Sequence, residues 1–224
     1  MINIEDKTEH DPVTDLYVTD AYMRWALLAA EEVVGKRGLA VVLREAGLER
    51  FLDNYPPEEV TKPSGQITFR DYAALNAGLF GFFGRAGKSM VLRIGRLSTQ
   101  RAIKQQGELF GLAAVIASKV LPIPTQLKMG LETMQGGFRK ISQSVGQDLR
   151  LRVQDRGDKL AYVTEDCPMC AGKQASEPMC WLWVGTLGEA THWQTGKEFE
   201  IVEVECRATG ASACVWEISK RPKG

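Results

Sequence analysis

The sequence predicts an α+β fold, in which an N-terminal helical layer packs on a small antiparallel sheet. Apolar residues recur at helical spacing from about residue 17 to residue 145, whereas residues 148–154 alternate apolar and charged side chains as a half-buried strand does. All five cysteines of the 224-residue chain lie after residue 166. The strand-rich part is therefore also the part that carries metal-ligand chemistry.

The composition is that of one ordinary globular domain. Hydrophobic residues make up 44% and charged residues 25% of the chain, and the formal net charge is zero, so no global field points to nucleic acid. No leader peptide opens the chain, and the longest apolar stretch, 109–121, is too short and too interrupted to span a membrane. We expect a soluble, cytoplasmic protein whose cysteines are ligands or free thiols.

Before residue 146 the chain divides into an arm and a helical part. Residues 1–16 hold five acidic side chains against Lys7 and predict a mobile acidic arm. The helical part spans residues 17–145, and within it Thr68 and Asp71 have the positions of a helix cap and first turn. Helices are expected over residues 17–34, 39–52, 68–83, 89–106, 109–119 and 125–145.

Residues 146–220 are expected to form the metal-binding α+β part of the same domain. Two strands form a hairpin around the turn 155–158, and a helix ended by Gly196 follows. Two further strands then turn at Gly210. The strands are expected over residues 148–154, 159–163, 199–207 and 213–218, and the helix over 179–195.

Gly210 is the midpoint between Cys206 and Cys214. A hairpin that turns there sets the two cysteines opposite each other, with Cβ atoms about 4.5–5.5 Å apart, close enough for both thiolates to bind one ion. Glu203 precedes Cys206 by three residues, an odd offset that places it on the other face of a regular strand. Glu203 therefore reaches this site only if the strand carries a bulge or a bend.

Three further cysteines complete the candidate metal site. Cys180 begins the late helix and can dock against the hairpin, and Cys167 and Cys170 form a Cys-x-x-Cys loop, a spacing that readily grips a metal. Because tetrahedral zinc takes four ligands, two selections stay open: Cys180, Glu203, Cys206 and Cys214, or four of the five cysteines. An iron–sulfur cluster, a redox-active Cys167/Cys170 pair and plain buried thiols are the alternatives.

The chain closes on Glu203-Val-Glu-Cys206-Arg-Ala-Thr-Gly210-Ala-Ser-Ala-Cys214, preceded by Cys167-Pro-Met-Cys170-Ala-Gly and Pro178-Met-Cys180-Trp-Leu-Trp-Val-Gly185. These runs resemble the 4-vinyl reductase domain family, also called the hydrocarbon-binding domain. The resemblance covers about residues 145–220, whereas the helical part matches only in layout. It is fairly specific, because five cysteines and two glycines coincide in order and spacing.

In phenol-sensing transcription activators with this domain, zinc is held by three cysteines and a glutamate. The resemblance thus implies zinc on Cys180, Glu203, Cys206 and Cys214, and it leaves Cys167 and Cys170 as candidates for additional ligands. The implied fold is that of the vesicle-tethering TRAPP subunits, which are usually dimeric. Members of the family bind small hydrophobic molecules between helices and sheet, and one is associated with bacteriochlorophyll synthesis.

Aromatic side chains are candidates for lining such a pocket, because ligand pockets are mostly apolar with a few polar groups. We nominate Trp25, Tyr72, Phe80, Phe83, Trp181, Trp183 and Trp193, with His192 as a hydrogen-bond donor to the ligand. Ordinary core packing explains aromatic residues at helical spacing equally well, and a satisfied surface or core histidine is the plain alternative for His192.

We therefore expect a binding module with structural zinc that holds a hydrophobic aromatic molecule as a sensor or carrier. The resemblance also implies a homodimer, and we expect a separate signalling partner protein. The alternatives are an accessory protein of tetrapyrrole (bacteriochlorophyll) biosynthesis, with a redox or iron–sulfur role for the extra cysteines, and a tethering-type dimer without ligand. No catalytic constellation stands out, and no recognised module indicates nucleic acid.

Overall fold

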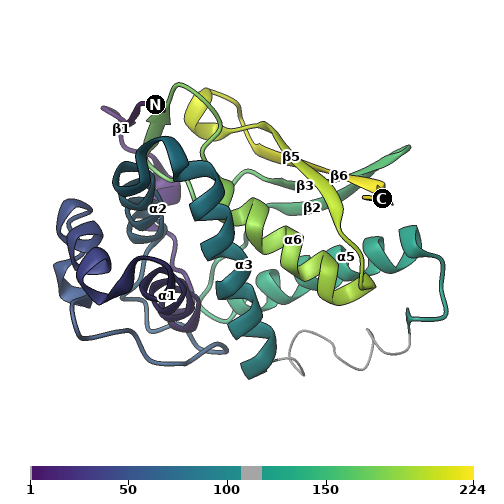
Figure 1. The fold of residues 1–224 in the computed structure, drawn as a ribbon, viewed down its shortest axis with the longest axis horizontal. Helices are drawn as coiled ribbons and strands as arrows, with labels where there is room; N and C mark the ends of the chain where they lie inside the picture. Colours follow the sequence, from purple (N-terminus) through teal and green to yellow (C-terminus); the bar gives the residue numbers. More distant parts are fainter. Residues whose placement is uncertain (1, 107–117) are drawn as a thin grey trace.

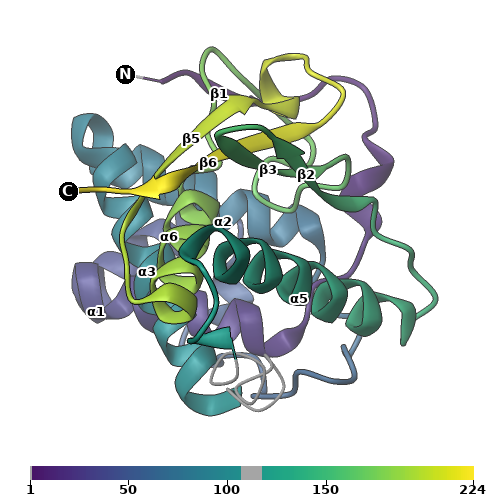
Figure 2. The ribbon, with the colours of Figure 1, turned by 90° about the vertical axis from the view of Figure 1, so that its right-hand side faces the viewer.

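The computed structural model describes residues 2–106 and 118–224. A four-stranded antiparallel sheet with the order β2-β3-β6-β5 carries helices on one face (Figures 1 and 2). Its strands are β2 (Leu151–Arg156), β3 (Lys159–Thr164), β6 (Cys214–Pro222) and β5 (Phe199–Glu205). The helix predicted over residues 109–119 falls almost entirely outside the described residues.

Two layers of helices cover this face of the sheet. α5 and α6 pack directly on the sheet, α3 packs on α6, and α1 and α2 lie against α3 (Figure 2). The helices are α1 (Asp20–Glu45), α2 (Phe69–Phe83), α3 (Gly87–Gln106), α5 (Ile123–Gln143) and α6 (Trp181–Thr195). None of the described helices combines the length and the apolar character needed to cross a membrane.

Local sequence signals explain several helix boundaries. Thr68 caps α2 in a reciprocal arrangement: the Thr68 backbone N–H donates to the Asp71 carboxylate at 2.8 Å, and the Asp71 N–H donates to the Thr68 hydroxyl at 3.4 Å. Gly35 kinks α1 with a φ of 72°, at the point where the sequence predicts a gap between two helices. α3 and α6 cross with their backbones in contact, because Gly95 and Gly185 meet there.

The N-terminal residues, for which the sequence predicts a mobile arm, lie against the cysteine-rich part of the chain. β1 (Ile4–Asp6) pairs with β4 (Lys173–Ala175), which directly follows the Cys-x-x-Cys loop (Figure 1). Asp11 is buried and forms an ion pair with Arg207 at 2.9 Å. The first strand of the chain is thus joined to the segment between the candidate metal ligands.

The β5–β6 hairpin carries the distortion that the sequence requires near Glu203. Glu203 pairs with Trp216 and Glu205 pairs with Val215, so two steps along β5 correspond to one step along β6. This irregularity is a β-bulge, which bends a strand and re-aims its side chains. The bulge lets Glu203 face the same point as the cysteines that flank the hairpin turn.

Candidate functional site

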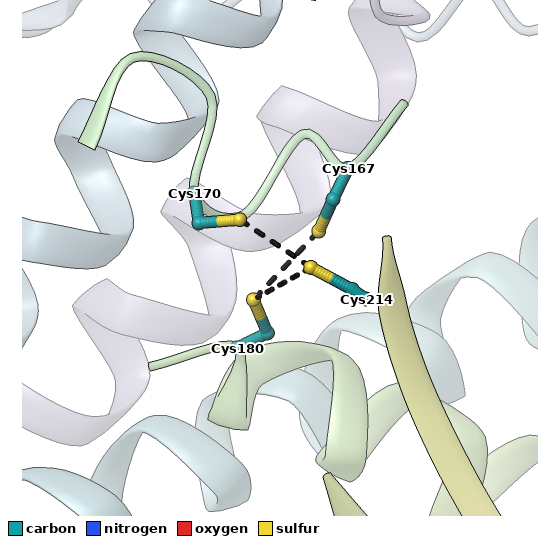
Figure 3. Close-up of side chains that lie close together, drawn as sticks. All are labelled: Cys167, Cys170, Cys180 and Cys214. Carbon is teal, nitrogen blue, oxygen red and sulfur yellow. Dashed lines mark hydrogen bonds between the residues drawn. The ribbon is translucent and has the colours of Figure 1, made fainter. Parts of the chain in front are cut away.

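The five cysteines come from distant segments and meet at one buried point. Cys167 and Cys170 belong to the loop after β3, Cys180 directly precedes α6, and Cys206 and Cys214 flank the turn of the β5–β6 hairpin. Figure 3 shows the side chains of four of them, all except Cys206, directed at one another. Each of the five is 0% exposed, and none forms a disulfide.

The sulfur–sulfur distances match the edges of a metal-centred tetrahedron. Cys180 Sγ lies 3.7 Å from Cys167 Sγ, 3.8 Å from Cys206 Sγ and 4.0 Å from Cys214 Sγ, and Cys170 Sγ lies 3.5 Å from Cys214 Sγ. A disulfide requires about 2.05 Å. Four sulfurs held about 2.3 Å from a central zinc ion lie about 3.8 Å from one another. The thiols are therefore spaced as metal ligands.

The Glu203 carboxylate joins this cluster from β5. One of its oxygens accepts a hydrogen bond from the Cys180 backbone N–H at 2.9 Å. The other oxygen is buried without a hydrogen-bond partner, although buried polar atoms are paired as a rule. A cation bound at the cluster would satisfy this oxygen, and the donor set of thiolates and one carboxylate is one that zinc accepts.

Without a cation, burial keeps most of the cluster protonated. Burial raises the pKa of Glu203 to about 7, against the opposing hydrogen bonds from Cys180 and Cys206, and it raises the pKa of Cys167 to about 12. Hydrogen bonds from the neighbouring thiols instead lower the pKa of Cys170. Because metal ligands bind in their deprotonated forms, a cation at this point would displace several protons.

Arg207 brings a positive charge to the cluster. Its backbone N–H donates to Cys214 Sγ at 3.3 Å, and its guanidinium donates to Asp11 at 2.9 Å. Burial lowers the pKa of Arg207, but the hydrogen bond to Asp11, the charge of Asp11 and the charge of Cys170 outweigh that effect, and the pKa is raised overall. The ion pair therefore fixes the N-terminal segment beside the thiols.

A cavity of about 150 Å³ adjoins the cluster. The Cys-x-x-Cys loop contributes Cys167, Pro168 and Met169 to its wall, and the remaining wall comes from the helices, the sheet and the segments beside them. Its lining aromatic residues are Tyr17, Tyr22, Trp25, Phe69, Tyr72, Phe138, Trp183, Trp193 and Trp216.

Four of the aromatic residues that the sequence nominates line this cavity, namely Trp25, Tyr72, Trp183 and Trp193. The other nominated side chains lie elsewhere. Phe80 is in the helical core, and Phe83 packs edge-on against Phe82, with ring centroids 5.4 Å apart. Trp181 lies beneath the Lys88 ammonium, and His192 is partly exposed beside Glu198.

Sequence reasoning missed Tyr22, Phe138 and Trp216 as cavity residues. Tyr22 and Phe138 have ring centroids 5.5 Å apart, Phe138 and Trp183 are also at 5.5 Å, and Trp183 and Trp216 are at 6.0 Å, so these rings form a continuous wall. Tyr22 precedes Trp25 by three residues, a spacing that places both on one helix face. Phe138 belongs to the apolar stripe of α5, so helical spacing was a usable signal for both.

Solved structures of H-NOX domains share this fold. A mutant of T. tengcongensis H-NOX matches with a TM-score of 0.58 and 14% identity, covering 92% of this chain and 99% of that one. The Fe(II) unliganded H-NOX protein from K. algicida matches with a TM-score of 0.58 and 12% identity, over 92% and 98%. An oxygen-binding H-NOX domain related to soluble guanylate cyclases gives 0.56 and 13%, over 92% and 96%. At these identities the likeness shows the fold alone.

This finding corrects the expectation of a TRAPP-subunit-like fold. Helices on a small antiparallel sheet are present as predicted, but their arrangement over most of the chain is that of H-NOX domains. Periodicity predicts which residues are helical or extended, and it does not determine how the helices are stacked.

The cysteine-rich segment also matches a known family by sequence. No curated protein sequence matches this chain significantly. The family model of the 4-vinyl reductase domain matches residues 160–220, the segment that contains all five cysteines and Glu203. The resemblance to the 4-vinyl reductase family is thereby confirmed, and residues 160–220 carry a domain of this family within an H-NOX-like fold.

Proposed function

We propose that this protein is a ligand-binding sensor domain whose ligand is a small aromatic molecule with a hydrogen-bond acceptor. One observation carries the proposal. The Tyr22 hydroxyl and the indole N–H groups of Trp183 and Trp216 border the aromatic cavity, and all three are buried without a hydrogen-bond partner. An indole N–H can only donate, so the missing partner has to be an acceptor.

The size of the cavity limits the ligand to about one ring. A dry apolar cavity of about 150 Å³, engineered into another protein, binds benzene, and the cavity described above has about 150 Å³. Each buried donor left unpaired costs about 1–3 kcal/mol, which an acceptor oxygen on the ring would offset. A phenol or a small aromatic carbonyl compound meets both conditions.

Structural zinc is the second part of the proposal. Cys180, Glu203, Cys206 and Cys214 have ligand atoms that all lie within 4.8 Å of one another. Four protein ligands close the coordination sphere, so zinc here would stabilise the fold without binding a substrate. It would tie the β5–β6 hairpin to the start of α6, the helix that presents Trp183 to the cavity.

Heme, whose distortion is the subject of one of the matching H-NOX structures, fits these residues poorly. The chain has two histidines. His10 pairs with Asp15 and His192 with Glu198, both partly exposed, and neither lines the cavity. A porphyrin is also several times larger than the single ring that the cavity accommodates. We therefore propose neither heme nor another tetrapyrrole as the ligand.

A homodimer and a signalling partner remain part of the proposal. The edge strand β5 exposes Val202 and Val204 at 44% and 43%, and an exposed apolar edge strand readily pairs with another chain. Light scattering of the purified protein tests the dimer: a mass twice that of one chain supports it, and a monomer contradicts it.

Tryptophan fluorescence tests the ligand proposal. Four of the five tryptophans line the cavity, and Trp181→Phe removes the signal of the fifth. Phenol should quench the fluorescence saturably and benzene more weakly. Ala190→Leu, which fills the cavity from α6, should abolish the response, whereas Ala77→Leu on α2, outside the cavity, should preserve it. The proposal fails if no phenol binds saturably, or if Ala190→Leu has no effect.

A further inference from the structure

The ligand atoms of the cluster form two overlapping sets of four. In one set, those of Cys167, Cys170, Cys180 and Cys214 all lie within 4.8 Å of one another, and the other consists of Cys180, Glu203, Cys206 and Cys214. Cys180 and Cys214 belong to both sets, and Figure 3 shows them facing the Cys-x-x-Cys loop. We infer that the two sets hold two zinc ions, bridged by the thiolates of Cys180 and Cys214.

The number of ligands matches a binuclear site. Each tetrahedral ion takes two terminal ligands and the two bridging thiolates, so four positions are filled on both ions. The terminal ligands are Glu203 and Cys206 for one ion and Cys167 and Cys170 for the other. This inference rests on the zinc ion proposed above and assigns the two cysteines that a single ion leaves unused.

The charge balance also permits a second ion. One zinc ion with three thiolates and one carboxylate carries two negative charges in total, and Cys167 and Cys170 then remain neutral thiols. Binding a second Zn²⁺ adds two positive charges and releases the thiol protons of Cys167 and Cys170 to solvent, which adds two negative charges. The net charge of the buried cluster therefore stays the same, so the second ion adds no net charge to be buried.

The shared edge has a geometric consequence. Cys180 Sγ and Cys214 Sγ are 4.0 Å apart, and two cations on either side of this edge repel one another. Drawing the bridging sulfurs together moves the cations apart at constant metal–sulfur distance. We expect this edge to be shorter than 4.0 Å in the loaded protein, with the terminal ligands moving little.

Metal analysis of the full chain, purified under reducing conditions and loaded with Zn²⁺, tests the inference. The unaltered protein should contain two zinc ions per chain. Cys167→Ser/Cys170→Ser and Cys206→Ser should each retain one, and Met169→Leu, a matched control in the same loop, should retain two. One ion in both the unaltered protein and the double variant would overturn the inference while the single zinc site stands. A folded protein without zinc would overturn both, and iron with acid-labile sulfide would replace the zinc pair by an iron–sulfur cluster.

Cobalt titration of the metal-free, unaltered chain keeps the inference testable if the serine variants do not fold. Thiolate-to-cobalt absorption should rise up to two equivalents of Co²⁺. The magnetic moment per cobalt should fall with the second equivalent, because bridging thiolates couple the spins of the two ions. Saturation at one equivalent, or an unchanged moment per ion, contradicts the bridged pair.

Discussion

Gly95 of α3 and Gly185 of α6 meet where the two helices cross, and neither position has room for a side chain. A Cβ on Gly95 would lie 2.0 Å from the Leu182 carbonyl oxygen, and a Cβ on Gly185 would lie 2.0 Å from the Leu92 carbonyl oxygen. Both helices contribute to the cavity wall. The crossing thus sets how closely the two walls approach each other.

Gly185→Ala should destabilise the protein by at least about 2 kcal/mol, because overpacking against backbone atoms forces the helices apart. Urea unfolding monitored by circular dichroism measures this. Gly136→Ala on α5 is the matched control, since a Cβ there meets nothing within 4 Å. The control should stabilise by up to about 1 kcal/mol through helix propensity. Equal stabilities of the two variants would show that the crossing tolerates a side chain.

Trp183→Phe should weaken phenol binding about five- to tenfold, since it keeps a ring in the wall and removes a donor worth about 1 kcal/mol. Benzene binding should change little, because benzene has no acceptor oxygen. Trp181→Phe, which alters a ring outside the cavity, should leave both affinities unchanged. Isothermal titration measures them, and a parallel loss for phenol and benzene would contradict the hydrogen bond.

The sequence was sufficient where a local signal determines the structure. The Thr68/Asp71 capping box and the β2–β3 hairpin form as predicted. The bulge beside Glu203 follows from an odd residue offset, and the structure confirms it. These features depend on residues a few positions apart, whose spacing can be read directly.

Features that depend on long-range packing were not predictable in this way. β1 pairs with β4 across more than 160 residues, and β4 has too few residues to show an alternating pattern. The approach of Cys167 to Cys180 and of Cys170 to Cys214 likewise depends on how the loop after β3 folds back. Trp216 reaches the cavity because of the sheet's position under the helices, which no local spacing indicates.

The metal-free protein should lose stability as the pH rises from about 4.5 to 7. Burial raises the pKa of Glu203 to about 7 in the folded chain, against an ordinary value of 4.5. In this window the folded state retains a proton that the unfolded state has released, so its contribution is complete at low pH and is lost as the pH rises through 7. A difference of about 2.5 pH units corresponds to about 3 kcal/mol.

Chelator-treated protein, unfolded with urea at pH 5 and pH 7, measures this dependence. Glu203→Gln cannot titrate, so its stability should fall less over the same interval. The same pH dependence in both proteins would assign the effect to other groups.

Asp11→Asn should destabilise the protein by about 3 kcal/mol, because it leaves the Arg207 guanidinium buried without a counter-charge. The side chains of Asp11 and Arg207 are 4% and 13% exposed. Asp11→Asn/Arg207→Met should recover part of the loss, since it removes the unpaired charge. Thermal unfolding of the zinc-loaded chains measures both, and a neutral Asp11→Asn would show that the N-terminal segment is not held by this pair.

A crystal structure of the protein soaked with 4-bromophenol tests the proposed ligand site most directly, because the anomalous signal of bromine locates the ring. We predict one bromine peak inside the cavity, with the phenol oxygen within hydrogen-bond distance of Trp183 Nε1, Trp216 Nε1 or the Tyr22 hydroxyl. A cavity that contains no bromine at ligand saturation, or bromine bound only on the outer surface, would contradict the proposed function.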